Sequence, residues 1–92
     1  MIDIRFEDFR SAAYDDGKII GECTFSVENN TWILSHTEVD PSYGGQGIAK
    51  RLLKSVVENA LSRGVKIKPV CSYVVKEFER HPEEYAAVRS SD

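Results

Sequence analysis

The sequence predicts a single α/β domain over residues 1–92, in which an antiparallel meander is followed by a β-α-β-α unit and the sheet is mixed. Two observations predict this class. Residues 1–39 alternate strand-like stretches with turn signals, and a glycine cluster then leads into an amphipathic helix with a further strand-like stretch behind it. A chain of 92 residues buries only about two-thirds of its unfolded surface, so we expect a modest core.

The meander is expected to hold three strands. Residues 5–14, residues 18–27 and Thr31–Val39 are rich in β-branched and aromatic side chains. The turn signals Asp15-Asp16-Gly17 and Glu28-Asn29-Asn30 separate these stretches, so neighbouring strands should run antiparallel.

Side-chain alternation assigns several meander residues to the core. In the second strand Cys23 shares a face with Phe25 and Val27, and we expect it to be a small buried hydrophobe. The aromatic residues expected in the core are Phe6, Phe9, Phe25 and Trp32.

The second half of the chain begins with the helix. Ile48–Arg63 has apolar residues at helical spacing and charged residues on the other face, and Gly64 ends it. Residues 65–71 have the pattern of a strand, which should lie parallel to the strand before the helix because a helix connects the two. Pro69 lacks a backbone N–H, so pairing should be interrupted near it.

The C-terminal part is expected to be helical and then frayed. Ser72 is the expected N-cap of a helix over residues 73–80. Pro82 restarts a short turn through Tyr85, and the polar end at residues 89–92 is expected to fray.

Three glycines in four positions, Gly44, Gly45 and Gly47, stand directly before the helix. Such a loop turns backbone amides toward one point, and the helix N-terminus adds unpaired amides and a positive dipole end. The pattern predicts a phosphate site, because a tight turn alone would explain one glycine but not three.

Two common phosphate loops do not fit this pattern. A Walker loop carries Lys and then Ser or Thr after its last glycine, whereas Gly47 is followed by Ile48-Ala49. A dinucleotide-binding fingerprint opens a βαβ unit, whereas the residues before this loop have the pattern of antiparallel strands. Both an NTPase and a Rossmann-type protein are therefore disfavoured.

The loop Gly44-Gly45-Gln46-Gly47-Ile48-Ala49 resembles the acetyl-CoA diphosphate loop of the GCN5-related N-acetyltransferases (GNATs). That loop reads Gln/Arg-x-x-Gly-x-Gly/Ala, and here Gly44 replaces its usual first residue. The similarity extends to His36-Thr37-Glu38-Val39, to Pro69-Val70-Cys71-Ser72-Tyr73-Val74 and to His81-Pro82-Glu83. Together these segments resemble the short YjdJ-type, NATD1-like subfamily, and the resemblance covers nearly the whole chain.

The resemblance implies a minimal acyl-CoA N-acyltransferase fold and transfer of an acetyl group from acetyl-CoA to an unidentified small amine or protein amine. Acetyl-CoA is the implied co-substrate, and no metal is implied. The loop amides would hold the diphosphate and the main chain of Val39 would bind the pantetheine. The CoA-binding residues implied in this way are Val39, Gly44, Gly45, Gln46, Gly47, Ile48, Ala49, Lys50 and Arg51. Lys50 and Arg51 are equally well explained as solvated residues of the first helical turn.

The candidate catalytic residues are Cys71, His36 and Tyr73. Cys71 ends a strand just before a helix N-terminus, where ligands bind in α/β sheets and thiol pKa values fall. In a GNAT-like sheet it would either accept the acetyl group as a thioester or line the tunnel, and a buried cysteine without a role is the alternative. His36 is a candidate base toward the amine or the thiol, or a surface residue. Tyr73 is a candidate proton donor to the CoA thiolate, or a packing aromatic.

Composition argues against several other classes. The net charge of −3 comes from interspersed charges, which disfavours a nucleic-acid-binding surface. Apolar stretches are too short for a membrane span and the N-terminus has no leader pattern, so we expect a cytoplasmic protein. Cys23 and Cys71 lack the spacing of a zinc or redox motif and should be free thiols. A monomer or weak homodimer is expected.

Two other functions stay open from the sequence. The chain has none of the N-terminal helices with which longer acetyltransferases shape the acceptor pocket, so it could be a CoA-binding module without transfer activity. Alternatively, Cys71 and His36 could hydrolyse acyl-CoA with water as the acceptor.

Overall fold

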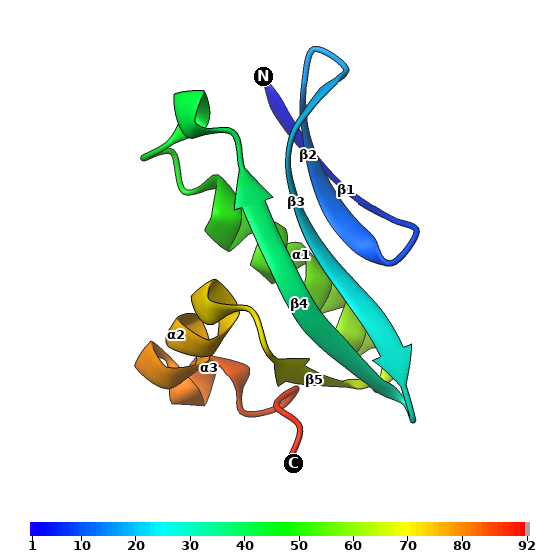
Figure 1. The fold of residues 1–92 in the computed structure, drawn as a ribbon. Coiled ribbons are helices and arrows are strands. Elements are labelled where there is room, and N and C mark those ends of the chain that lie inside the picture. Colours follow the sequence, from blue (N-terminus) through cyan, green and yellow to red (C-terminus); the bar gives the residue numbers. More distant parts are fainter. Residues whose placement is uncertain (92) are drawn as a thin grey trace.

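The computed structural model describes residues 1–91, in which five strands form one sheet in the order β1-β2-β3-β4-β5 (Figure 1). The strands are β1 (Ile2–Glu7), β2 (Arg10–Asp15), β3 (Lys18–Glu28), β4 (Thr31–Val39) and β5 (Lys66–Pro69). The first four form an antiparallel meander, and β5 pairs parallel to β4. The predicted mixed α/β sheet is therefore confirmed.

The single strand predicted over residues 5–14 is wrong, because this stretch crosses two strands. Asp8 and Phe9 take positive φ angles of 32° and 62° and turn the chain from β1 into β2. Two-residue hairpin turns of this kind usually carry Asn or Gly, so Asp-Phe gave no turn signal. Phe9 was expected in the core, but it lies at this turn with 63% of its surface exposed.

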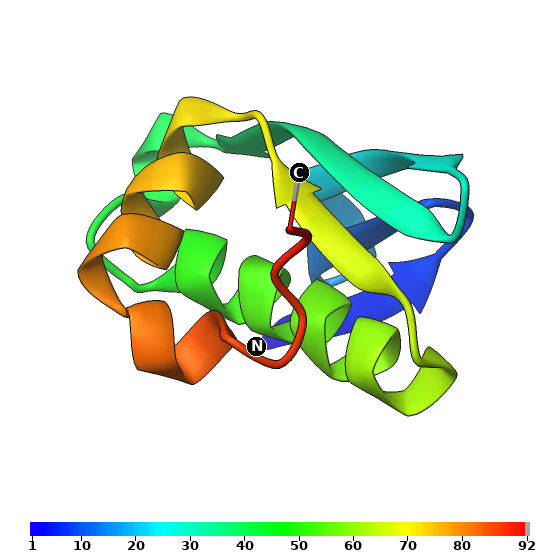
Figure 2. The same ribbon diagram turned by 90° about the horizontal axis from the view of Figure 1, so that it is seen from below.

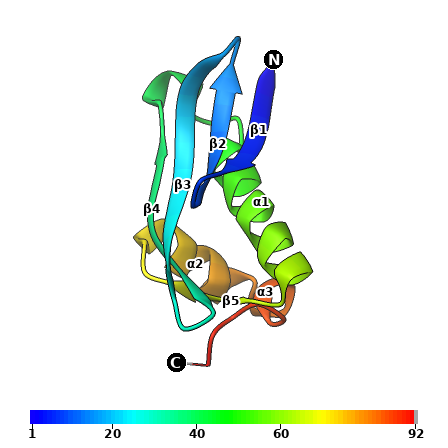
Figure 3. The same cartoon turned by 90° about the vertical axis from the view of Figure 1, so that its right-hand side faces the viewer.

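Helix α1 (Ile48–Arg63) has the predicted bounds, and Gly64 ends it with a φ of 68°. It lies along one face of β1–β4, and no described helix covers the opposite face (Figure 3). Its apolar side packs on that inner face through Ile48, Leu52, Leu53, Val56, Val57 and Ala60. The aromatic residues Phe25 and Trp32 stack there with ring centroids 4.3 Å apart, as their expected burial implies. Val27 was expected beside them but is 51% exposed, because it lies next to the last residue of β3.

A short 3-10 helix, η1 (Pro41–Tyr43), follows β4, and α2 (Ser72–Arg80) and α3 (Pro82–Tyr85) follow β5. Helix α2 begins one residue earlier than predicted, so its N-cap is Cys71 and not Ser72. The turn from Pro82 through Tyr85 is confirmed. None of the described helices is long and apolar enough to cross a bilayer.

The C-terminal segment was predicted to fray, but its described residues are held in place. It runs beside β5, where the Ile67 N–H donates to the Val88 carbonyl at 2.6 Å and the Ser90 N–H donates to the Ile67 carbonyl at 2.8 Å (Figure 2). Val88 is fully buried, so the segment is tied down by both packing and hydrogen bonds. Asp92, which belonged to the same prediction, lies outside the described residues.

The pairing of β3 with β4 contains one irregularity that matters for the site. Thr24 lies opposite His36 and Phe25 lies opposite Leu34, so Ser35 is an extra residue on β4 without a partner. This β-bulge reverses the alternation of side chains along the rest of β4.

Candidate active site

An opening separates β4 from β5 beyond Leu34. The two strands pair only as far as Leu34 opposite Pro69, which confirms the predicted interruption near Pro69. The N–H groups of Val70 and Cys71 both donate to the Leu34 carbonyl, at 3.0 and 2.9 Å, and the chain then turns into α2. Strand β4 runs on to Val39, so its outer edge faces the opening (Figure 1).

The edge of β4 presents backbone groups to this opening. The Asp40 N–H points the other way, toward β3, where it donates to the Ile20 carbonyl at 2.8 Å. Because backbone groups alternate in direction along a strand, Thr37 and Val39 direct their N–H and C=O groups into the opening. No described strand pairs with this part of the edge. The main chain of Val39 therefore faces this opening, and its binding to the pantetheine stays a prediction.

The glycine loop lies between the end of β4 and the start of α1. Gly45 and Gly47 have φ angles of 79° and 70°, a left-handed conformation that favours glycine. The first hydrogen bond of α1 runs from the Arg51 N–H to the Gly47 carbonyl at 3.2 Å. The amides of residues 48–50 precede that bond and are the unpaired donors of the helix start.

The surroundings of the helix start suit an anion. Gly47 is the N-cap and offers no side chain to these amides, and no acidic residue lies in the first turn. Lys50 and Arg51 are exposed directly beside them, and Gln46 is also exposed. The loop is held at its beginning by Tyr43, whose hydroxyl donates to Asp15 Oδ2 at 2.5 Å.

Cys71 lies at the opening, half-buried at the N-cap of α2. Burial by itself raises the pKa of this thiol, but hydrogen bonds that its sulfur accepts from the Thr37 hydroxyl act in the opposite direction. The amides of Val74 and Tyr73, at the start of α2, and the amide of Thr37 add to that effect. The net result is a pKa below the ordinary value for cysteine, which is the property that the sequence position predicted.

Cys23, the other free thiol, has the opposite environment. It is fully buried on β3, as predicted, and burial raises its pKa to about 11. Cys23 therefore stays protonated near neutral pH.

His36 is not beside Cys71. Because the bulge at Ser35 reverses the alternation, His36 lies on the open outer face of the sheet. Thr37 takes the inner position, where its hydroxyl donates to the sulfur of Cys23 at 3.6 Å. The described partners of His36 are carboxylates on that outer face: its Nε2 is 3.8 Å from Glu22 and 3.6 Å from Glu38. The structure thus brings together His36 and two acids that the sequence did not single out.

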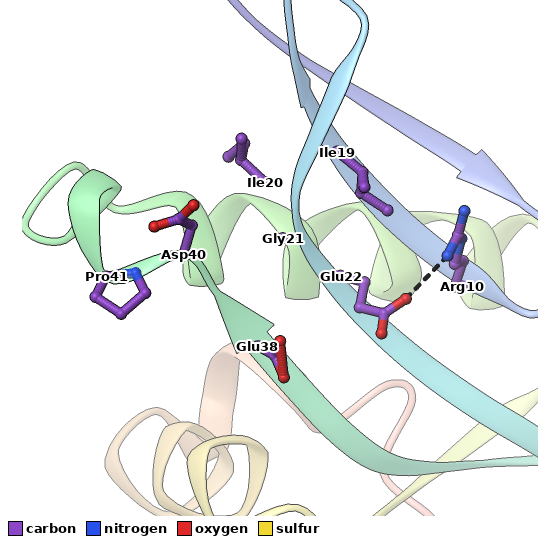
Figure 4. Close-up of a pocket in the computed structure, with 8 residues that line it drawn as sticks. All are labelled: Arg10, Ile19, Ile20, Gly21, Glu22, Glu38, Asp40 and Pro41. Atoms are coloured by element: carbon purple, nitrogen blue, oxygen red, sulfur yellow. Dashed lines mark hydrogen bonds and ion pairs between the residues drawn. The ribbon is translucent and has the colours of Figure 1, made fainter.

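The outer face is hollowed next to these acids. A depression of about 560 Å³ combines carboxylates, one arginine and apolar side chains (Figure 4). Its lining residues are Arg10, Ile19, Ile20, Gly21, Glu22, Glu38, Asp40 and Pro41. Arg10 is already paired, because its guanidinium lies 2.9 Å from Glu22 and 3.1 Å from Glu7. Glu22 and Glu38 meet because the register of β3 and β4 places them opposite each other. No local sequence pattern indicates this acidic surface.

Tyr73 lies in the first turn of α2 and packs against the core. Burial, and secondarily the nearby Glu77 carboxylate, raise the pKa of its phenol to about 12. The hydroxyl therefore holds its proton at neutral pH. Within residues 1–91, no group of histidine, cysteine and acidic side chains is arranged to hold a metal ion.

Comparison with known proteins decides the family. Residues 9–88 match the GCN5-related N-acetyl-transferase family. The chain belongs to this family of acyltransferases. Among solved structures, the GNAT chain resembles the solution structure of a GCN5-like protein from Staphylococcus aureus, with 32% identity, a TM-score of 0.72, and 96% of this chain and 87% of that chain covered.

Two further relatives show how far the likeness reaches. The protein NATD1 of Homo sapiens is 37% identical over 49 residues, which cover 53% of this chain and 43% of NATD1, so less than half of that protein is matched. The PaiA N-acetyltransferase of Thermoplasma acidophilum, solved in complex with coenzyme A, shares the fold with a TM-score of 0.63 at 19% identity, and 82% of this chain and 48% of that chain are covered.

Proposed function

We propose that this protein transfers the acetyl group of acetyl-CoA to an amine. The observation that carries the proposal is the continuity of three features: the uncapped start of α1, the free edge of β4, and Cys71 at the far side of the opening. A long, anionic thioester matches this arrangement, with its diphosphate on the amides and its acyl end beside the thiol. The coenzyme A bound to the PaiA enzyme, which shares the fold, supports this choice of co-substrate.

The diphosphate would lie on the amides of residues 48–50, with Lys50 and Arg51 beside it. The pantetheine would run along the edge of β4 and hydrogen-bond the main chain of Val39, much as a further strand would. The acetyl thioester would then reach the region of Thr37 and Cys71, where β4 and the chain after β5 are still close.

Two routes of transfer fit this geometry. In the direct route the amine nitrogen attacks the thioester carbonyl, the carbon–sulfur bond breaks, and the CoA thiolate takes the proton that the amine nitrogen loses. The Tyr73 hydroxyl would donate a hydrogen bond to that thiolate. In the covalent route the Cys71 thiolate attacks the thioester carbonyl and CoA leaves as its thiolate. The amine then attacks the acetyl-cysteine thioester, the bond to the Cys71 sulfur breaks, and the thiolate takes the proton that the amine nitrogen loses. The lowered pKa of Cys71 favours the covalent route, since the thiolate is the nucleophile.

His36 would serve the acceptor and not the thiol. It lies on the outer face beside Glu22 and Glu38, on the side of β4 away from the Thr37 side chain. Carboxylates attract a protonated amine, and an imidazole can take the proton that the amine must lose before attack. The proposal therefore favours a cationic acceptor approaching across this face.

The hydrolase alternative paired His36 with the Cys71 thiol, and the geometry does not favour that pairing, because the two side chains lie on opposite faces of the sheet. A single experiment separates the functions. Purified protein is incubated with acetyl-CoA and a panel of cationic and neutral amines, and free CoA is measured by thiol titration. We expect release that depends on a cationic amine. Release without any amine would indicate hydrolysis, and CoA binding without release would indicate a binding module.

A further inference from the structure

An aromatic pocket opens beside the C-terminal end of α1, where the chain also turns from β3 into β4 (Figure 2). Its volume is about 220 Å³. The residues that line it are Phe6, Phe9, Phe25, Val27, Trp32 and Arg63. The glycine loop lies at the other end of α1, and a helix of sixteen residues is about 24 Å long, so the pocket is separate from the proposed acetyl-CoA site.

Stacked aromatic rings form the floor of this pocket. The ring centroids of Phe25 and Trp32 lie 4.3 Å apart, and that of Phe6 lies 5.9 and 5.6 Å from them. Phe25 and Trp32 are buried, whereas Phe9 and Val27 are exposed and form the rim. An apolar ring that entered the pocket would therefore leave water and stack against other rings.

Among the described residues that line the pocket, only Arg63 is charged. Its guanidinium carbon lies 4.8 Å from the centre of the Phe6 ring and 5.7 Å from that of Trp32. Within residues 1–91 no carboxylate forms an ion pair with Arg63. The N–H groups of a guanidinium point outward in its own plane, so a guanidinium that lies on aromatic rings can still bind a carboxylate with two parallel hydrogen bonds.

These features select a class of ligand. The rings favour an apolar, planar group, and the unpaired guanidinium favours an anion attached to it. Drug-sized ligands occupy pockets of about 300–1,000 Å³, so this smaller pocket suits a single ring with a short acidic arm. A cationic ligand would be repelled by Arg63, and a neutral one would leave the guanidinium without an anion.

We propose that this pocket binds a small aromatic carboxylate, whose ring lies on Phe25 and Trp32 and whose carboxylate pairs with Arg63. The inference does not rest on the proposed acetyl transfer, because none of the lining residues belongs to the opening between β4 and β5 or to the glycine loop.

The test uses phenylacetate as the probe and the fluorescence of Trp32 as the readout. Trp32 is the single tryptophan of the chain, so its emission reports on this pocket alone. Acetate, which lacks the ring, and phenylacetamide, which lacks the charge, are the control ligands.

Three variants accompany the wild type. Arg63→Gln removes the charge, and Phe9→Ala removes part of the exposed rim. Arg80→Gln is the matched control, because Arg80 is also an exposed arginine in the last turn of its helix but lies outside the pocket. A thermal melt of each variant establishes that it is folded.

We expect phenylacetate to change the Trp32 emission saturably, with a Kd of about 1 mM for a ligand of about ten heavy atoms. Arg63→Gln should weaken binding about tenfold and Phe9→Ala several-fold, whereas Arg80→Gln should bind like wild type. Phenylacetamide should bind at least about tenfold more weakly than phenylacetate, and acetate should leave the emission unchanged.

Two results from the titrations would overturn the inference: no saturable change in the wild type, or equal affinity in folded Arg63→Gln. A third would come from the protein without any ligand. A change of Trp32 emission on dilution would show that a second copy of the chain covers the pocket.

Discussion

The two ends of α1 provide a matched pair of substitutions for the diphosphate site. Gly47 and Gly64 have nearly the same left-handed φ, 70° and 68°, and a Cβ on either would meet nothing within 4 Å. Alanine at either position therefore costs conformational energy and no packing energy. That cost is about 1–2 kcal/mol for a left-handed residue other than glycine, so both variants should melt roughly 4 to 16 °C lower than wild type.

The two variants should differ in CoA binding. Gly47 is the N-cap of α1, so an added methyl group would lie in front of the amides that the diphosphate needs. Loss of one charge-assisted hydrogen bond costs about 1.5 kcal/mol or more, which is roughly a tenfold loss of affinity. Gly64 lies at the opposite end of the helix and has no contact with that site.

Isothermal calorimetry with CoA, below both melting transitions, measures this difference. Gly47→Ala should bind at least about tenfold more weakly than wild type, and Gly64→Ala should bind like wild type. Equal affinity in all three proteins would show that the diphosphate binds elsewhere. Equal losses in both variants would show that the effect is one of general stability.

Three further predictions follow from other parts of the site. Tyr43→Phe should weaken CoA binding several-fold in calorimetry, because it frees the glycine loop from Asp15. The Tyr43 hydroxyl, and secondarily the N-terminal ammonium, hold the pKa of Asp15 below its usual range. The ionised Asp15 carboxylate therefore stabilises the fold at pH values above its usual pKa, and this stabilisation is lost as the pH falls through the lowered pKa. Tyr43→Phe should flatten that acid loss in melts between pH 2 and 6, and an unchanged acid profile would refute the assignment. Cys71→Ala should abolish any acetyl adduct seen by intact-mass analysis while CoA still binds, and an adduct on Cys23 would contradict the covalent route. Glu38→Gln should raise KM for a cationic amine and leave KM for a neutral amine unchanged; equal effects on both amines would argue against an acidic acceptor surface.

The sequence by itself determined the local elements. The apolar spacing from Ile48 to Arg63 fixed α1 to the residue, since a helical period over sixteen positions admits one face and Gly64 ends it in a left-handed conformation. The glycine loop before it, and the position of Cys71 between a strand and a helix N-terminus, were equally readable, because each depends on neighbouring residues only. These elements sufficed to predict the fold class and the family.

Pairing between strands decided what the sequence could not. The turn at Asp8 and Phe9 carries no glycine, and its conformation is imposed by β1 and β2 pairing around it. The residues after Val88 were expected to be free, yet the open edge of β5 gives their backbone groups hydrogen-bond partners. Such partners come from segments distant in sequence, so no local sequence pattern predicts them.

The bulge at Ser35 has the largest consequence for function. A one-residue shift between β3 and β4 turns His36 to the outer face, toward Glu38, and turns Thr37 inward to the thiols. Because side chains alternate with a period of two, a single unpaired residue exchanges the faces of everything that follows it in the strand. The sequence supplied the residues of the site, and the register of two strands, set by the packing of the whole sheet on α1, decided which of them meet.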